Sequence, residues 1–408
     1  MKTAGIVAEY NPFHQGHAYQ IQKTKEETGA NAIVVILSGS FVQRGEVAIA
    51  DKWTRTKAAL MGGADLVLEL PAIFALSAAP SFAFGAVQSL IDSGLIDLLS
   101  FGVENATEKN LKKLASFLLE EPPAFSAFLK EQLAKGLAYP VSLSMAIKQY
   151  LPKCASLVET PNNILALEYT KTVLKKQSTV SLFPLPRHGE GYHSQTLSAS
   201  YPSASALRKA IQTKNIAALQ KGVPPALWPL YQKAWEEGRF PFSTDSLFGP
   251  LQYALLQQTP GSLREILEVE EGLEHRLLRL FSQANSWEEL LCLLQSRRYS
   301  RPQLSRLLIH VLLGQTTSQL QQLQQQGGAP YLRVLGYRKE SAFLLSKLHQ
   351  TSRLPVVTSV KDALATLPPE AKRLLKQECF ATNLAALCSP STPFRTPNQD
   401  YTHPLLRL

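Results

Sequence analysis

Two histidines on either side of a glycine are the residues near the start of the chain whose types and spacing point to chemistry. The apolar run "TAGIVAEY" is followed at once by "NPFHQGH", which contains His14, Gly16 and His17. A helix that begins at about Gly16 presents unpaired backbone N–H groups and the positive end of its dipole, which together bind anions. The two imidazoles would donate hydrogen bonds to phosphate oxygens, and displacement at phosphorus needs no protein nucleophile.

The alternative role of His14 and His17 is structural, because a lone histidine more often caps a helix or fills a partly buried position. Two histidines with a glycine, at the end of a predicted first strand, favour a functional site instead. A second stretch of this kind is "PSASALR", in which Ser203 or Ser205 is expected to cap a helix that contains Arg208. Both stretches are therefore predicted to lie at helix N-termini.

Short apolar runs alternate with helical patterns in the N-terminal part of the chain. Strands are expected over residues 4–10, 32–39, 65–70, 96–102 and 179–187, and helices over residues 16–28, 51–63, 81–94, 108–120 and 162–176. This alternation predicts a parallel sheet with helices on both faces, because right-handed crossovers place them there. Ligands bind at the carboxyl ends of such strands, and His14 follows the first one.

The C-terminal part has a different pattern. Helices are expected over residues 247–259, 272–284, 286–296 and 303–314, and two short strands over 330–337 and 353–359. We therefore predict an α/β fold with a Rossmann-like parallel sheet in residues 1–220, followed by a mostly helical basic domain in residues 245–408.

Composition narrows the class of protein. The 408 residues carry a formal net charge of +10, which favours polyanionic partners such as nucleic acid. The four cysteines form no CxxC pair, so neither a zinc site nor a disulfide framework is indicated, and no other metal site is evident. No signal peptide pattern and no membrane-length apolar run are present, so we expect a cytoplasmic protein without membrane contact.

Basic residues gather in the C-terminal part, and the densest group is "SRRYSRPQLSR". Its arginines Arg297, Arg298 and Arg301 are the best candidates for binding RNA phosphates, and Arg306, Arg333, Tyr299 and Tyr331 belong to the same basic and aromatic pattern. The alternative is a solvated basic helix face, because charge runs are common on surfaces.

A second polar loop, "SGSFVQRGEVAIADKW", follows the second predicted strand and should lie beside the ligand site at the end of the first strand, where Gln43, Arg44, Asp51, Lys52 and Arg55 supply polar groups. Lys52 and Arg55 in this region are expected either to face phosphates or RNA or to form a solvated helix start. No catalytic role is assigned to either residue.

The two histidine and serine stretches together resemble the HxGH and ISSTxxR motifs of the nucleotidyltransferase superfamily. The stretches "GIVAEYNPFHQGH", "ADLVLELP", "FGVEN", "PNNILALEY" and "PRHGEGYHS" further resemble the tRNA(Met) cytidine acetate ligase family of bacteria, over essentially the whole chain. That resemblance implies an enzyme that activates acetate with ATP and Mg²⁺ to acetyl-adenylate. It then acetylates N4 of the wobble cytidine of elongator tRNA(Met).

The resemblance also implies site residues, with His14 and His17 at the phosphates as the catalytic pair and Ser205 and Arg208 as possible phosphate contacts. The residues that it assigns to ATP are Val7, Ala8, Glu9, Tyr10, Asn11, Pro12, Phe13, His14, Gln15, Gly16, His17, Ala18, Tyr19, Gln20, Gly102, Asn162 and Arg187. Gly102 would admit adenine or ribose, Asn162 would read polar edges, and Arg187 would pair with phosphate.

Two other functions stay open at this point. One is an adenylyltransferase for a small metabolite, and the other is an RNA-binding protein regulated by a nucleotide. The residues that hold acetate, the general base for the cytidine amine and the oligomeric state are not indicated by any pattern.

Overall fold

A computed structural model describes residues 1–187, 203–213, 215–296 and 298–408. Within them, one eight-stranded sheet has the strand order β10-β8-β5-β2-β1-β6-β7, and β9 also pairs with β8. The strands are β1 (Thr3–Ala8), β2 (Ala32–Ser38), β5 (Leu66–Leu70), β6 (Leu98–Val103), β7 (Ser181–Pro186), β8 (Leu332–Tyr337), β9 (Val356–Val357) and β10 (Leu406–Arg407). The five strands expected from the N-terminal part of the sequence are all present.

The centre of the sheet is parallel, as predicted. β1 pairs in parallel with β2 and β6, β2 with β5, and β6 with β7, whereas β8 lies antiparallel to β5. All seven residues of β2 are buried, because helices cover both faces of the sheet. Ile33, Val35 and Leu37 belong to one hydrophobic cluster and Val34 and Ile36 to another, as the alternation of side chains along a strand requires.

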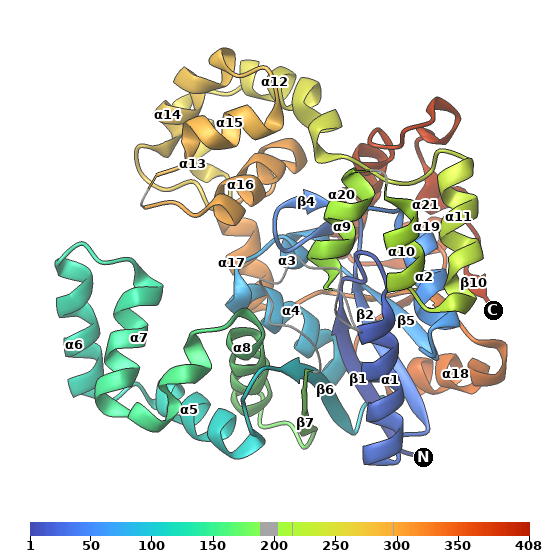
Figure 1. Ribbon diagram of the computed structural model, residues 1–408, viewed down its shortest axis with the longest axis horizontal. Coiled ribbons are helices and arrows are strands. Elements are labelled where there is room, and N and C mark those ends of the chain that lie inside the picture. The colour runs from blue at the N-terminus through green and yellow to red at the C-terminus, as the bar shows by residue number, and fades with distance from the viewer. Residues whose placement is uncertain (188–202, 214, 297) are drawn as a thin grey trace.

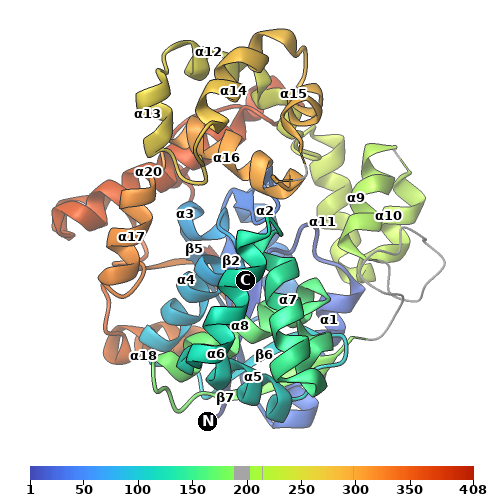
Figure 2. The same cartoon turned by 90° about the vertical axis from the view of Figure 1, so that its left-hand side faces the viewer.

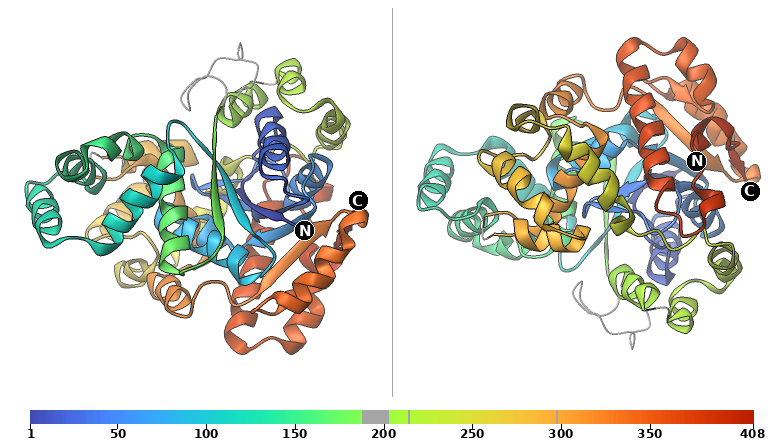
Figure 3. Two further views of the ribbon diagram at one scale, coloured as in Figure 1. Left: turned by 90° about the horizontal axis from the view of Figure 1, so that it is seen from below. Right: turned by 90° about the horizontal axis from the view of Figure 1, so that it is seen from above.

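The helices divide between these two faces (Figures 1 and 2). Residues of α1 (Gln15–Thr28), α2 (Lys52–Met61) and α11 (Trp228–Glu236) pack in one cluster, and those of α4 (Ala79–Asp92) and α8 (Pro161–Lys175) pack in the other. Further helices before residue 223 are α3 (Ala72–Ala75), α5 (Glu108–Glu120), α6 (Pro123–Ala134), α7 (Tyr139–Tyr150), α9 (Ala204–Gln212) and α10 (Ile216–Gly222). The α6 and α7 helices extend from one side of the molecule (Figure 3).

A third hydrophobic cluster lies in a helical unit that packs on the β3–β4 hairpin (Phe41–Val42 and Glu46–Val47). The unit consists of α12 (Phe248–Leu256), α13 (Pro260–Glu265), α14 (Leu273–Leu280), α15 (Trp287–Leu294) and α16 (Arg301–Leu313). The chain continues through α17 (Thr317–Gln325), α18 (Ala342–Thr351), α19 (Val360–Thr366), α20 (Pro369–Ala386) and α21 (Gln399–Thr402).

The two strands expected near the C-terminus are confirmed as β8 and β9, with α18 between them. They and β10 belong to the same sheet as β1, so the region 245–408 supplies strands to the N-terminal sheet as well as helices. The division into domains 1–220 and 245–408 stays a prediction. Strands from both ranges belong to one sheet.

Lys52 and Arg55 neither face phosphates or RNA nor form a solvated helix start, because both side chains are fully buried. Lys52 Nζ lies 2.7 Å from Glu69 Oε1 and 2.7 Å from Asp400 Oδ1, and Arg55 donates to the carbonyl oxygens of Glu9, Ser38, Gly39 and Ala50. These cations therefore hold the interior together and do not face solvent, phosphate or RNA.

Arg333 completes this buried ion cluster, with contacts of 2.9 Å to Glu69 Oε2 and 2.6 Å to Asp400 Oδ1. Burial alone would raise the pKa of Asp400, but Lys52 and Arg333 hold that pKa well below its ordinary value. The four charges link α2, β5, β8 and α21. The expectation that Arg333 belongs to an RNA-binding surface was wrong.

No helix in the described ranges is long and apolar enough to cross a membrane.

Candidate functional site

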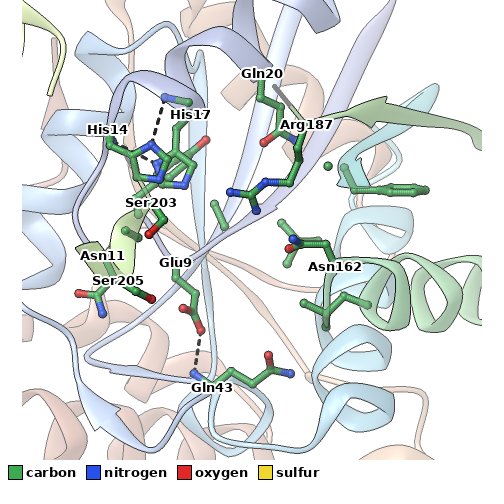
Figure 4. Close-up of a pocket in the computed structure, with 18 of the residues that line it drawn as sticks. Glu9, Asn11, His14, His17, Gln20, Gln43, Asn162, Arg187, Ser203 and Ser205 are labelled. Atoms are coloured by element: carbon green, nitrogen blue, oxygen red, sulfur yellow. Dashed lines mark hydrogen bonds between the residues drawn. The ribbon is translucent and has the colours of Figure 1, made fainter. Parts of the chain in front are cut away.

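A cavity of about 270 Å³ opens at the carboxyl ends of β1, β6 and β7 (Figure 4). The N-terminal turns of α1, α8 and α9 all reach it. Its lining residues are Val7, Ala8, Glu9, Tyr10, Asn11, His14, Gly16, His17, Tyr19, Gln20, Gln43, Arg44, Phe82, Phe101, Gly102, Asn162, Leu165, Tyr169, Leu185, Pro186, Arg187, Ser203, Ala204, Ser205 and Arg208. The cavity lies where a ligand site was expected, beyond the end of the first strand.

His14 and His17 form a reciprocal cap at the start of α1. His14 is the N-cap residue, and its Nδ1 accepts a hydrogen bond of 3.0 Å from the Gly16 backbone N–H. His17 Nδ1 accepts one of 3.2 Å from the His14 backbone N–H. This pairing is a histidine version of a capping box, which normally uses serine or threonine with glutamate. Both side chains therefore have the structural, capping role, and their role at phosphates stays a prediction.

The cap also determines which ring nitrogen carries a proton. Because each Nδ1 accepts from a backbone N–H, the hydrogen of each neutral ring must sit on Nε2. The rings are stacked with centroids 3.7 Å apart. Burial lowers the pKa of His14 to about 3, with Arg187 and Arg208 adding to the effect, and burial, His14 and Arg187 lower the pKa of His17 well below its ordinary value. Each histidine is thus a neutral donor through Nε2.

The loop between β1 and α1 is held by hydrogen bonds between side chains and backbone groups. Asn11 Oδ1 accepts from the Ile49 backbone N–H at 2.7 Å, and Arg208 Nη1 donates to the Asn11 carbonyl at 3.0 Å. Tyr10 adopts a positive φ of 45°, which is uncommon for a residue with a side chain. Arg208 therefore joins α9 to the histidine loop, and Ser203, whose Oγ accepts from Ala206 N–H, caps α9 as expected.

The opposite wall brings Gly102, Asn162 and Arg187 together. A side chain on Gly102 would meet Arg187 Cγ at 3.3 Å, so the glycine leaves room for this arginine beside the strand end. Asn162 Nδ2 donates to Glu104 Oε1 at 2.5 Å, and Glu104 Oε2 accepts from Thr160 Oγ1 and from the Asn163 backbone N–H. Glu104 belongs to the "FGVEN" stretch but was assigned no role from the sequence, and its carboxylate ties the start of α8 to the end of β6.

Glu9 and the β3–β4 hairpin form the floor of the cavity. Glu9 Oε1 accepts from the Gln43 backbone N–H at 2.7 Å. Burial raises the pKa of Glu9, although the Gln43 N–H and the cations of Arg208 and Arg44 act in the opposite direction. Gln43 and Arg44 line the cavity, as expected for a polar loop that follows the second strand.

Four residues of the expected ATP span do not line the cavity: Pro12, Phe13, Gln15 and Ala18. Phe13 is fully buried against Gly62, and Gln15 Nε2 donates to the Lys221 carbonyl, away from the histidines. The rest of the span from Val7 to Gln20 reaches the cavity wall.

Comparisons with known proteins agree with this geometry. The family model described as HIGH Nucleotidyl Transferase matches residues 1–400. A tRNA(Met) cytidine acetate ligase of Acetivibrio thermocellus is 35% identical, with 100% of both chains covered. One of Clostridium perfringens is 36% identical, with 98% of both chains covered. The chain belongs to the tRNA(Met) cytidine acetate ligase family. The resemblance seen in the motifs is confirmed.

Solved structures of the family have the same fold. Thermotoga maritima TmcAL bound with alpha-thio ATP superposes with a TM-score of 0.93 at 28% identity, and the apo form of the same protein with a TM-score of 0.95. Both comparisons cover 100% of each chain. The α/β fold of the nucleotidyltransferase type is thereby confirmed.

Of the predicted RNA-binding arginines, Arg298 and Arg301 lie outside the cavity, just before and at the start of α16. Arg297 is not among the described residues. Arg298 is exposed and pairs with Glu270 at 3.2 Å, and Arg301 pairs with Glu288. Both arginines have acidic partners from other parts of the helical unit, so a polyanion would have to compete with these partners for them.

Three other members of the basic and aromatic pattern, Tyr299, Arg306 and Tyr331, are not on the surface. Arg306 is largely buried, with Nε 2.8 Å from Glu268 Oε1, and Tyr299 and Tyr331 are buried as well. The expectation that these residues join an exposed stacking surface was wrong. Carboxylates from distant parts of the chain form ion pairs with Arg306 and Arg333. The spacing of residues in the sequence does not reveal these partners.

Proposed function

We propose that this protein uses ATP to activate acetate as acetyl-adenylate and then transfers the acetyl group to N4 of the wobble cytidine of elongator tRNA(Met). The observation that carries the proposal is the pair of Nε2–H donors that His14 and His17 present at the start of α1, in a cavity at the carboxyl ends of the parallel strands. A relative of the same fold is bound with an ATP analogue. We assign ATP to this cavity.

The first step is in-line displacement at the α-phosphorus. An acetate oxygen attacks, the bond to the bridging oxygen breaks, and pyrophosphate leaves with the electron pair. The α1 N-terminus, the two histidines and Arg187 would stabilise the charge that shifts to the phosphates. Neutral imidazoles suit this task, because each ring already carries hydrogen on Nε2. It can donate to a phosphate oxygen without first taking up a proton from solvent.

Mg²⁺ belongs to the proposal as a part of the Mg-ATP substrate. No group of three or more metal-ligating side chains occurs in the ranges that the structure describes, and Glu9 is the sole described carboxylate in the cavity lining. Mg²⁺ commonly keeps several waters and takes its other ligands from nucleotide phosphates. The residues present therefore fit an ion that arrives with the nucleotide.

In the second step the cytidine amine attacks the acetyl carbonyl and AMP leaves. We propose that tRNA reaches the cavity from the side of the helical unit, with Arg298 and Arg301 among its phosphate contacts. The cytoplasm, where tRNA, ATP and acetate meet, is the compartment that we propose.

Product analysis with Mg-ATP distinguishes the proposed function from its two rivals. A ligase of this kind releases pyrophosphate only when acetate is supplied, and it forms AMP when tRNA is supplied too. An adenylyltransferase would leave the nucleotide attached to a metabolite, and a nucleotide-regulated RNA-binding protein would release neither product. Pyrophosphate release that does not depend on acetate would contradict the proposal.

A further inference from the structure

We propose that the Glu9 carboxylate accepts the proton that the cytidine N4 amine loses as it attacks the acetyl carbonyl. This inference rests on the proposed function and names the group that the second step requires. The N–C bond forms, the C–O bond to AMP breaks with its electron pair on the phosphate oxygen, and one N4 proton passes to Glu9. No further reactant is needed.

The position of Glu9 is well defined from two sides. Its backbone carbonyl accepts from Arg55 Nη1 at 2.9 Å, and its side-chain Oε1 accepts from the Gln43 backbone N–H at 2.7 Å. The side chain extends from the end of β1 along the cavity wall toward Gln43 (Figure 4). A carboxylate anchored by one oxygen in this way has a defined direction for the other.

Several other titratable groups of the described lining are poor proton acceptors. His14 and His17 each use Nδ1 for a backbone N–H and carry hydrogen on Nε2, so neither ring has a lone pair directed at a substrate. Tyr10 and Tyr169 hold their protons, because burial raises the pKa of both phenols. The arginines of the lining are permanently protonated.

Phosphate binding is not a role that suits Glu9. A carboxylate repels the triphosphate and acetate alike, whereas the cytidine amine is a neutral donor that becomes acidic as it is acylated. In a cavity proposed to bind anions, the Glu9 carboxylate therefore suits a partner that donates a proton, such as the cytidine amine.

Burial and the charges around Glu9 shift its pKa in opposite directions. Arg208 faces it from α9, Arg44 and Glu46 from the β3–β4 hairpin, and Arg55 and Tyr169 from α2 and α8. Burial outweighs the cations and raises the pKa of Glu9 above its ordinary value of 4.5. A general base works best when its pKa approaches the pH of the reaction.

The test separates the two half-reactions in Glu9→Gln. Glutamine keeps an oxygen that accepts from the Gln43 N–H but cannot take up a proton. We expect acetyl transfer to tRNA in a single turnover to fall by about 100-fold or more, and acetate-dependent exchange of pyrophosphate into ATP to fall far less. Transfer by the unmodified protein should rise with pH through the titration of Glu9, and this dependence should vanish in the variant.

Glu46→Gln is the matched control. Glu46 lies on the same hairpin beside Arg208, 3.9 Å from its Nε, but does not line the cavity. Removing that charge should keep transfer and its dependence on pH, with the pH profile shifted to lower pH because Glu46 raises the pKa of Glu9. A general loss of negative charge near Arg208 is then excluded as the cause of a lost pH dependence in Glu9→Gln.

Three results would overturn the inference. They are normal transfer in Glu9→Gln, an equal loss of exchange and transfer, and a loss of exchange that added Mg²⁺ restores, which would make Glu9 a group that serves Mg-ATP. The proposed function fails separately, if the unmodified protein forms no N4-acetylcytidine. Melting temperatures of both variants identify any loss of folding.

Discussion

His14 and His17 each perform two tasks with two ring nitrogens. Nδ1 completes the cap of α1, and Nε2 presents a hydrogen to the cavity. A serine or aspartate would cap the helix as well but would present no N–H donor, which explains why imidazoles are used at both positions. Burial and the nearby arginines keep both rings neutral.

Replacement of His17 by alanine should lower acetate-dependent pyrophosphate exchange by about 100- to 1,000-fold, because one preorganised donor to the phosphates is lost. Gln15→Ala is the control on the same helical turn, since the Gln15 side chain bonds to the Lys221 carbonyl and does not line the cavity. Exchange at an unchanged rate in His17→Ala would show that the histidine does not contact the phosphates.

The pH dependence of stability tests the neutral state of His14. Its folded pKa of about 3 lies below the ordinary value of 6.5, so its contribution is fully present above pH 6.5 and is lost as the pH falls toward 3. The free energy of unfolding should decrease over that window, and the decrease should be smaller in His14→Asn, where asparagine can still cap the helix. Urea unfolding at several pH values measures both; identical pH dependence in the two proteins would contradict a depressed pKa.

The histidine pair was predictable from sequence because its residues are close in the chain and follow an apolar strand. Glu104 was not, because its partners at Thr160 and Asn162 lie more than fifty residues away. Gln43 and Arg44 were predicted to lie beside the site, but the contacts of their loop with the distant helical unit were not. The sequence therefore revealed the hydrogen-bond donors His14 and His17. The distant contacts that position the site could be found only in the fold.

Among the elements, the β3–β4 hairpin connects the cavity to the helical unit. Ser305 Oγ on α16 donates to the Gly45 carbonyl at 2.6 Å, and Arg306 Nη1 donates to the Gln43 carbonyl at 3.3 Å. Gln43 in turn holds Glu9. The helix that begins beside the predicted RNA-binding arginines thus places its first turns on the loop that lines the cavity.

Gly45→Ala tests this contact. Gly45 has a φ of +79°, and a Cβ there would lie 2.3 Å from the Arg306 backbone nitrogen, so either the hairpin or α16 must shift. Gly29→Ala is the control, with a φ of +69° but nothing within 4 Å of the added carbon. We expect Gly45→Ala to cost about 1–3 kcal/mol more in urea unfolding than the control.

The same variant has a catalytic readout. Because Gln43 and Arg44 line the cavity, a displaced hairpin should raise the KM for ATP, and Gly29→Ala should leave it unchanged. Equal effects of the two substitutions on stability and on KM would show that α16 does not position the loop.

Strand and helix positions were largely predictable, because period and length are local properties of the sequence. The pairing of β8 with β5 was not, since a six-residue apolar strand does not reveal its partner, and β10 is two residues long. The assignment of residues 245–408 to a mostly helical domain therefore overlooked their contribution to the sheet.

For the molecule as a whole, the net charge of +10 does not predict where a polyanion binds. Arg306 and Arg333 count toward that charge but are buried beside carboxylates. Lys52 is buried in the same ion cluster as Arg333. Arg298 and Arg301 remain as accessible cations of the densest basic group. Burial rather than composition selects the arginines that tRNA can reach.

The double variant Arg298→Glu with Arg301→Glu should weaken tRNA binding. Each phosphate contact that the substitutions remove should reduce the slope of log affinity against log salt by about 1. Lys130→Glu with Lys135→Glu is the control, an equal change of charge at exposed positions on α6 and at its C-terminal end. Filter binding at several salt concentrations measures both, and equal weakening in the two variants would place the RNA surface elsewhere.

The whole molecule is proposed to deliver acetate, activated in the cavity at the carboxyl ends of β1, β6 and β7, to one cytidine of tRNA. The decisive measurement is nucleoside mass spectrometry of unmodified elongator tRNA(Met) after incubation with the purified protein, Mg-ATP and isotopically labelled acetate. We predict labelled N4-acetylcytidine with an equivalent amount of AMP. Unmodified tRNA in the presence of continuing, acetate-dependent pyrophosphate release would contradict the proposed acceptor, and the absence of both products would contradict the proposed function altogether.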